Sequence, residues 1–194
     1  MLLRLVAGIV CAASLVTATG ADAQPWRWSD PDEMMTGGRP LGRNYGVSPI
    51  SRTTVSYSGP HAPGTIVINT TERRLYLVTG NGQAIRYGIG VGRDGFTWSG
   101  VKRISSKKEW PSWTPPAQML RRRPDLPRHM AGGLDNPLGA RAMYLGSSLY
   151  RIHGSNEPET IGQAVSSGCF RMTNEDVVDL YNRVAIGTTV IVMR

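Results

Sequence analysis

The chain has 194 residues, of which 40% are hydrophobic and 19% are charged. This balance is typical of a globular protein and excludes an intrinsically disordered chain, and the length is sufficient for one domain with additional segments. The formal net charge of +8 suits a polyanionic partner, either a nucleic acid or an anionic envelope or acidic peptide. The 23 glycines and 13 prolines, with few long helical patterns, predict a β-rich fold with many turns.

The first 23 residues have the pattern of a secretory signal peptide. Arg4 provides the positively charged N-terminal region, residues 5–16 form the apolar region, and Ala21-Asp22-Ala23 matches a small-x-small cleavage site. The run is too short and too rich in Ala and Ser for a membrane span, although an uncleaved anchor is the alternative. We therefore expect residues 1–23 to be removed and the mature protein to have no stable transmembrane segment. Export also argues against a nucleic acid as the partner.

Removal of this signal peptide changes the cysteine count. Cys11 leaves with the signal, and Cys169 remains as the single cysteine of the mature chain. Paired cysteines become disulfides in an oxidising compartment, so a free thiol there calls for a functional reason. The alternative is a buried structural cysteine, and the residues around Cys169 decide between the two.

The domain organisation follows from composition. Residues 24–62 are rich in Pro, Gly, Ser, Arg and Asp without a sustained apolar period, which predicts a flexible tether. A folded domain is predicted over residues 63–194. It begins with a meander of three strands and continues with further strands, at residues 65–69, 74–78, 84–91, 101–107, 142–145, 149–153 and 188–193.

Two helices and one long loop complete the predicted domain. The loop covers residues 109–141, holds one short helix at residues 118–123, and is of a length that is usually functional or mobile. Within it, His129 is either a surface residue or part of a binding site. The second helix is predicted to begin after Thr173 as N-cap and to end at Gly187, with apolar residues at helical spacing at Val177, Leu180, Tyr181 and Val184.

The residues that carry chemistry lie just before this second helix. A predicted strand ends at His153, and a glycine-containing turn presents Cys169. The thiolate is the nucleophilic form of cysteine, and a free thiol with a pKa of about 8.5 is only slightly ionised at neutral pH. A neighbouring imidazole can accept the proton and return it to a leaving amine. We therefore predict Cys169 as nucleophile and His153 as base, with the carbonyl of Gly154 or Ser155 orienting the ring.

Residues beside the predicted nucleophile suit acyl transfer. The amides of Gly168 and Cys169 are predicted to face the developing oxyanion. Arg171 is predicted to hold a carboxylate through two hydrogen bonds, with Ser166 and Ser167 as further substrate contacts. A single His is more often structural and a single Arg is more often a solvated charge. The ordered combination in an exported chain favours a catalytic site.

The segment from His153 to Met172 resembles the signature of the L,D-transpeptidase family, also called the YkuD domain. That signature places His-Gly ahead of a Ser-x-Gly-Cys-φ-Arg block, in which φ is apolar, and the similarity extends over residues 63–194. Trp113-Thr114-Pro115-Pro116 and Asn136-Pro137-Leu138-Gly139 resemble segments of its Gram-negative branch. Some branches have a second His where this chain has Ser167, and Phe170 replaces the more usual Ile or Leu.

The resemblance implies a mainly β fold, a β-sandwich or barrel-like domain with one or two short helices. It also implies a periplasmic enzyme in which Cys169 attacks a peptidoglycan tetrapeptide stem and forms a thioester. A stem amine as acceptor gives a 3→3 cross-link, a lysine attaches an envelope protein, and water makes the enzyme an L,D-carboxypeptidase. Carbapenems are expected to acylate the same cysteine. No cofactor and no metal are expected, since His61, His129 and His153 lack metal-ligand spacing.

Three other classes of protein fit less well. In a papain-like protease the cysteine comes first in the chain and the histidine far behind it, which is the reverse of the order here. A sortase usually keeps its histidine much further upstream and lacks the Ser-x-Gly-Cys turn. A non-catalytic wall-binding module would tolerate the loss of Cys169, His153 and Arg171, yet all three are present.

Overall fold

The computed structural model describes residues 48–194. The predicted signal peptide, residues 1–23, and residues 24–47 of the predicted tether lie outside this range. The described chain is dominated by strands, which confirms the predicted mainly β class. Its elements in chain order are β1 (Thr53–Ser56), β2 (Ile66–Asn69), β3 (Arg74–Gly80), β4 (Gln83–Gly88), β5 (Val91–Gly92), β6 (Gly100–Glu109), α1 (Ala117–Arg122), β7 (Arg141–Leu145), β8 (Arg151–His153), the 3-10 turn η1 (Pro158–Thr160), β9 (Ala164–Ser166), β10 (Phe170–Arg171), α2 (Asn174–Arg183) and β11 (Thr189–Met193).

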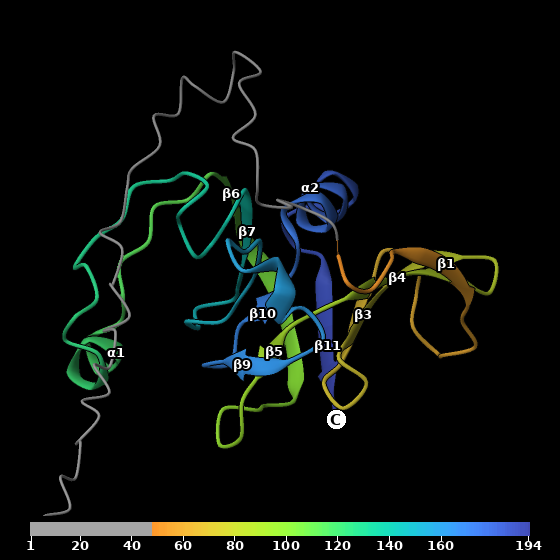
Figure 1. Cartoon of the computed structure of the whole chain (residues 1–194). Helices are drawn as coiled ribbons and strands as arrows, with labels where there is room; N and C mark the ends of the chain where they lie inside the picture. Colours follow the sequence, from red (N-terminus) through yellow and green to blue (C-terminus); the bar gives the residue numbers. More distant parts are fainter. Residues whose placement is uncertain (1–47) are drawn as a thin grey trace, which may run out of the picture.

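Most of the strands form one continuous sheet with the order β1-β4-β3-β2-β11-β6-β7-β8-β10, while β5 pairs with β9. The long strand β6 joins its two halves, because its first residues pair with β11 and its last residues pair with β7. The register of β6 shifts between Ile104 and Ser106 at this crossing. The two halves enclose a single core, to which both contribute fully buried side chains such as Ile66, Leu75, Leu145 and Ile152. β1 and β10 therefore lie at opposite edges of the sheet (Figure 1).

The predicted meander is present as β2, β3 and β4, which pair in antiparallel register. Leu75 and Leu77 are buried on one face of β3, as their alternation predicts. The hairpin between β3 and β4 turns at Asn81 and Gly82, both with positive φ, which is the conformation that two-residue hairpins favour. The predicted strand over residues 84–91 is instead divided, since β4 ends at Gly88 and β5 pairs with β9 in another sheet.

Helix α2 begins as its sequence predicts and ends earlier. The Thr173 hydroxyl accepts a hydrogen bond from the Asp176 amide at 3.2 Å, and Val177 and Leu180 are fully buried against the sheet. The helix stops at Arg183 because Val184 is extended. Gly187, which was predicted to end the helix, has a φ of 93° and instead turns the chain into β11.

The predicted tether is too long at its C-terminal end. Within residues 24–62, β1 pairs with β4 along its whole length. The Arg52 guanidinium also lies 3.4 Å from the Asp176 carboxylate and 3.5 Å from that of Asp179, both on α2. Backbone pairing and ion pairs hold this segment, and it buries few apolar side chains. Its sequence therefore shows no apolar period.

The long loop between β6 and β7 is present at the predicted place, and α1 lies within one residue of its predicted bounds. The loop extends away from the sheet and carries α1 at its far end (Figure 1). Asn136 is buried near its C-terminal end, where the side-chain amide donates to the Ala131 carbonyl at 2.8 Å and the amide oxygen accepts from Leu138 N at 2.9 Å. His129 is exposed and contacts Thr114 of the same loop at 3.1 Å. Among residues 48–194, no helix combines the length and apolarity that a bilayer span requires.

Candidate active site

Four polar residues share one face of the short parallel pair β8–β10. Arg171 stands opposite His153 in the register of this pair. Continued by one residue from the pair of Phe170 and Ile152, this register places Cys169, which directly precedes β10, opposite Arg151, and alternate residues of a strand project to the same face. The predicted nucleophile and the predicted base are therefore diagonal neighbours on this face, and each of them stands beside an arginine.

The opposite face of the same strands lies in the core. Ile152, Phe170 and Met172 are at most 1% exposed. A shift of the register by one residue would bring the polar set into the core, so the burial of these side chains fixes which face carries the site. Phe170 occupies the apolar position that follows the cysteine in the family signature. Its ring contacts that of Trp98, with ring centroids 5.5 Å apart.

The His153 ring is buried and oriented by the backbone. Its Nδ1 lies 2.6 Å from the Gly154 carbonyl oxygen, the contact that the sequence predicted. A carbonyl only accepts, so Nδ1 carries the proton and Nε2 is left with a free lone pair. Burial, with smaller contributions from Arg171 and Arg151, lowers the pKa of His153 from 6.5 to about 3, against an opposing effect of the Gly154 carbonyl. The ring is therefore neutral at physiological pH and available as a base.

The Cys169 thiol is partly exposed and contacts the backbone. Its Sγ donates to the Leu149 carbonyl oxygen at 3.6 Å. Burial raises the pKa of Cys169, and the positive charges of Arg151 and Arg171 oppose this shift. The resting pair is thus a neutral thiol and a neutral imidazole. For the thiol to act as a nucleophile, its proton has to leave the sulfur.

The turn before Cys169 is held by Ser166, which corrects two predictions. Ser166 is buried, its hydroxyl donates to the Cys169 carbonyl at 2.6 Å, and the same oxygen accepts from Gly168 N at 3.1 Å. Ser166 is therefore not placed to contact a substrate. The Gly168 amide, which was predicted to face an oxyanion, is already engaged within the turn. The Cys169 amide remains as the candidate oxyanion donor.

Both the backbone conformation at position 168 and the small space beside it require a glycine. Its φ is 107°, and a Cβ there would lie 2.5 Å from the Tyr150 ring. The Tyr150 ring stacks on Trp98 with centroids 4.6 Å apart, and Trp98 Nε1 donates to the Gly168 carbonyl at 2.8 Å. The two aromatic residues thus clamp the turn that presents Cys169. Nothing local in the sequence pointed to either of them.

Arg171 is bound to a carboxylate of the protein itself. Its Nη1 lies 2.6 Å from Glu157 Oε2, and the Thr160 hydroxyl lies 3.5 Å from the same nitrogen. Any external carboxylate has to compete with Glu157 for this guanidinium. Ser167 is the more accessible of the two predicted serine contacts, and its hydroxyl lies 3.4 Å from Arg93 Nη1.

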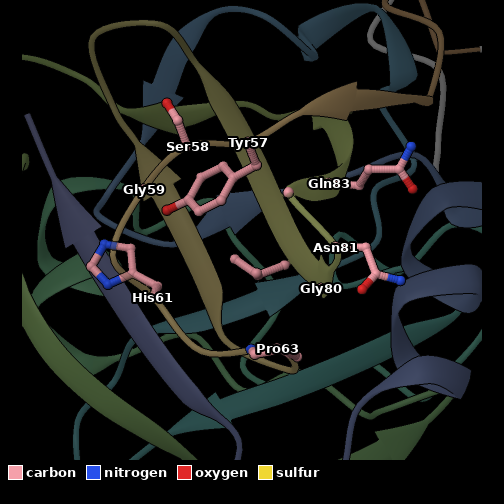
Figure 2. A pocket seen from close by; sticks show the side chains of 10 residues that line it. Tyr57, Ser58, Gly59, His61, Pro63, Gly80, Asn81 and Gln83 are labelled. Carbon is pink, nitrogen blue, oxygen red and sulfur yellow. The ribbon is translucent and has the colours of Figure 1, made fainter.

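A separate cavity of about 380 Å³ lies away from these residues. It is formed by the segment after β1 and by the β3–β4 hairpin, with Tyr57, His61, Asn81 and Gln83 around it (Figure 2). None of the predicted site residues lines it. Because β1 and β10 are the two edges of the sheet, this cavity belongs to the other side of the fold.

The sequence matches YkuD, the L,D-transpeptidase catalytic domain, over residues 63–192. The chain belongs to the L,D-transpeptidase family. It is 40% identical over 134 residues to the probable L,D-transpeptidase YbiS of Escherichia coli, which covers 64% of this chain and 43% of that protein. This relative supports the predicted Gram-negative branch. The chain spans less than half the length of this curated relative.

Solved structures show the same fold. A Brucella melitensis structure, described as a probable carnitine operon oxidoreductase CaiA, is 46% identical, covers 76% of this chain and 96% of that chain, and superposes with a TM-score of 0.51. The redox description belongs to that protein, whereas residues 63–192 of this chain match the transpeptidase domain. L,D-transpeptidase 3 of Mycobacterium tuberculosis is 19% identical, covers 67% of this chain and 60% of that chain, and gives a TM-score of 0.53. That enzyme has also been solved with a faropenem-derived adduct.

Proposed function

We propose that the protein is a periplasmic L,D-transpeptidase that acts on peptidoglycan tetrapeptide stems through a thioester at Cys169. The observation that carries this proposal is the parallel pair β8–β10, whose register, continued by one residue to Cys169, puts the thiol on the same face as the neutral, backbone-oriented imidazole. The membership of the family supplies the reaction class, and the predicted signal peptide at residues 1–23 supports the compartment.

In the proposed acylation, the Cys169 sulfur attacks the carbonyl of the third stem residue, a diamino acid. His153 Nε2 takes the thiol proton as the sulfur–carbon bond forms, and the carbonyl oxygen becomes an oxyanion beside the Cys169 amide. The tetrahedral intermediate then collapses, the bond to D-alanine breaks, and His153 returns the proton to the leaving amine. A thioester and free D-alanine result, and the imidazole is neutral again.

The second half of the reaction depends on the acceptor. An amine of another stem, deprotonated by His153, attacks the thioester and gives a 3→3 cross-link with the thiol restored. A lysine of an envelope protein gives protein attachment by the same step. Water as acceptor makes the protein an L,D-carboxypeptidase, the alternative that we retain.

Recognition of the donor is proposed to involve Arg171 and Ser167. Arg171 can offer a guanidinium to a stem carboxylate once Glu157 has been displaced, and Ser167 is partly exposed next to Arg93. The net charge of +8 favours the approach of an anionic wall polymer. The faropenem-derived adduct of the tuberculosis enzyme supports β-lactams as inhibitors, and carbapenems are proposed to acylate Cys169.

The test is digestion of isolated peptidoglycan with the purified protein, followed by mass spectrometry. We expect released D-alanine together with 3→3 linked dimers, and neither product from a Cys169→Ala protein that retains its fold. Release of D-alanine without dimers identifies the carboxypeptidase. Equal amounts of product from the parent and from Cys169→Ala refute the enzymatic assignment and leave a wall-binding module.

A further inference from the structure

Arg151 and the Cys169 thiol converge on one backbone oxygen. Arg151 Nη1 donates to the Leu149 carbonyl at 3.1 Å, and Cys169 Sγ donates to the same oxygen at 3.6 Å. The register of β8 and β10, continued by one residue from the pair of Phe170 and Ile152, also places Arg151 opposite Cys169. The guanidinium is steadied from another side by the Tyr144 ring, whose centroid lies 5.1 Å from Arg151 Cζ. The sulfur and a fixed cation are thus neighbours.

One hydrogen-bond donor of the Arg151 guanidinium has no partner among the described residues. Arg151 Nε is buried and has no hydrogen-bond partner within residues 48–194. Buried donors without a partner are rare, because each loses its bonds to water without replacement. The thiol cannot satisfy this donor well, since a neutral sulfur is a weak acceptor. A thiolate in the same place is a charged acceptor and forms a stronger bond.

The two arginines near the sulfur, Arg151 and Arg171, differ in their hydrogen-bond partners. Arg171, from β10, is bound to the Glu157 carboxylate, whereas Arg151, from β8, donates to a neutral carbonyl. His153 is the remaining titratable group on this face, and it is neutral. Burial raises the pKa of Cys169, and Arg151 is the first of the groups that oppose this shift. The charge of Arg151, unlike that of Arg171, is therefore not neutralised by a carboxylate and can stabilise a thiolate at Cys169.

We propose that Arg151 is a further catalytic residue, which holds the Cys169 thiolate through its Nε–H and its positive charge. When the thiol proton passes to His153 Nε2, the sulfur loses the hydrogen that it donated to Leu149. The Leu149 oxygen keeps its bond from Arg151 Nη1, and the sulfur becomes the acceptor of Nε–H. This inference rests on the proposed function in taking the Cys169 thiolate as the nucleophile.

The test measures the thiolate without any peptidoglycan substrate. Iodoacetamide alkylates the thiolate with loss of iodide, so the rate at Cys169, followed by peptide mass mapping across a pH series, reports its ionisation. We expect Arg151→Gln to raise the midpoint of this profile by about one pH unit, which makes alkylation at neutral pH about tenfold slower. Arg151→Lys keeps the charge but lacks Nε–H, so its midpoint is expected between those of the parent and Arg151→Gln.

Arg86→Gln is the matched control. Arg86 lies on β4, is also half-buried, and also has a buried Nε without a partner among the described residues. We expect its alkylation profile to equal that of the parent. A folded Arg151→Gln protein with the parent's midpoint overturns the proposal. If Arg151→Gln does not fold, Arg151→Lys decides in the same way, a raised midpoint supporting the proposal and an unchanged one overturning it.

The release of D-alanine is measured separately on the same proteins. A parent that is alkylated normally but releases no D-alanine contradicts the proposed function, while the shift of the midpoint in Arg151→Gln still supports the contact between Arg151 and the thiolate. Conversely, an active parent whose midpoint is unaffected by both Arg151 substitutions retains the proposed function and loses this inference.

Discussion

Arg171 and Glu157 form an ion pair with a distance of 2.6 Å, directly beside the imidazole that Arg171 faces across the β8–β10 pair. The arginine that was predicted to receive a substrate carboxylate is thus occupied by a carboxylate of the protein. The Glu157 side chain is 51% exposed and that of Arg171 is 21% exposed, so water and a ligand can both reach this pair. Under the proposed function, Glu157 is therefore a competitor that the carboxylate of a donor would have to displace.

The first prediction concerns Glu157→Gln. This change removes the competing charge and leaves Arg171 free, so we expect the KM for a tetrapeptide donor to fall while kcat changes little. A partly exposed ion pair contributes at most about 1 kcal/mol, which limits the effect to about fivefold. The measurement is the rate of D-alanine release against donor concentration. Glu159→Gln, an exposed carboxylate on the neighbouring turn η1, is the control and should leave KM unchanged. A KM that rises in Glu157→Gln contradicts the competition.

The second prediction is covalent modification by a carbapenem. The partly exposed thiol and the neutral imidazole are expected to open the β-lactam ring, with Cys169 forming a thioester to the lactam carbonyl. Intact-mass analysis after incubation should show one adduct on the parent and none on Cys169→Ala. An unmodified parent argues against an open, reactive site.

The third prediction concerns the role of His153 in acylation. Without an imidazole, the thiol proton has no buried acceptor beside it, so we expect His153→Gln to slow acylation about 100- to 10,000-fold. Single-turnover acylation by a carbapenem, followed by mass, gives the rate directly. Unchanged kinetics in His153→Gln would mean that another group acts as the base.

The fourth prediction links the buried His153 to stability at acid pH. In the unfolded chain the imidazole binds a proton below its ordinary pKa of 6.5, whereas in the folded protein the lowered pKa is about 3. Between these two values the unfolded state binds more protons, so the free energy of unfolding decreases as the pH falls. The slope that His153 contributes is about 1.4 kcal/mol per pH unit within this window.

Urea unfolding between about pH 4 and pH 6 measures this slope. We expect the parent to lose stability more steeply than His153→Gln, by about the slope of one titrating group. The carboxylates titrate in both proteins, so their contributions cancel in the comparison. Parallel curves for the two proteins contradict a neutral, buried imidazole.

The residues of the candidate site that lie close together in the sequence could be proposed from the sequence, and their catalytic roles stay a prediction. His153, Gly154 and the segment from Ser166 to Arg171 follow one another closely, and their residue types suit acyl transfer in that order. The remaining residues around the site lie far from it in the sequence, or are brought to it only by the register of paired strands. Trp98 lies 70 positions before the Gly168 carbonyl that it binds. Arg151 is brought near Cys169 only because β8 and β10 pair in parallel, with Ile152 opposite Phe170.

The errors have physical causes of the same kind. The sequence predicts an oxyanion contact for the Gly168 amide because it does not show that this amide donates to the Ser166 hydroxyl. The predicted tether is too long because β1 is mostly exposed, so its sequence lacks the apolar alternation that indicates a strand. The core strands and α2 were predicted well because burial imposes a period on their sequences.

The last prediction concerns Gly168→Ala, which tests whether the shape of the turn matters in addition to its chemistry. An alanine there has to adopt a φ of 107°, and its Cβ overlaps the Tyr150 ring. Such a backbone conformation costs a non-glycine residue about 1–3 kcal/mol, and relief requires the turn or the Tyr150–Trp98 stack to move. Because both hold Cys169 in place, we expect slower acylation as well as lower stability.

Gly64→Ala separates these two effects. Gly64 also has a positive φ, of 83°, but nothing lies within 4 Å of the Cβ position, and it directly precedes β2 rather than Cys169. We expect it to lower the free energy of unfolding by about 1–2 kcal/mol and to leave acylation unchanged. Gly168→Ala should reduce both quantities, measured by urea unfolding and by the rate of carbapenem adduct formation. Acylation at the parent's rate in Gly168→Ala shows that the clamp of Trp98 and Tyr150 does not position the nucleophile.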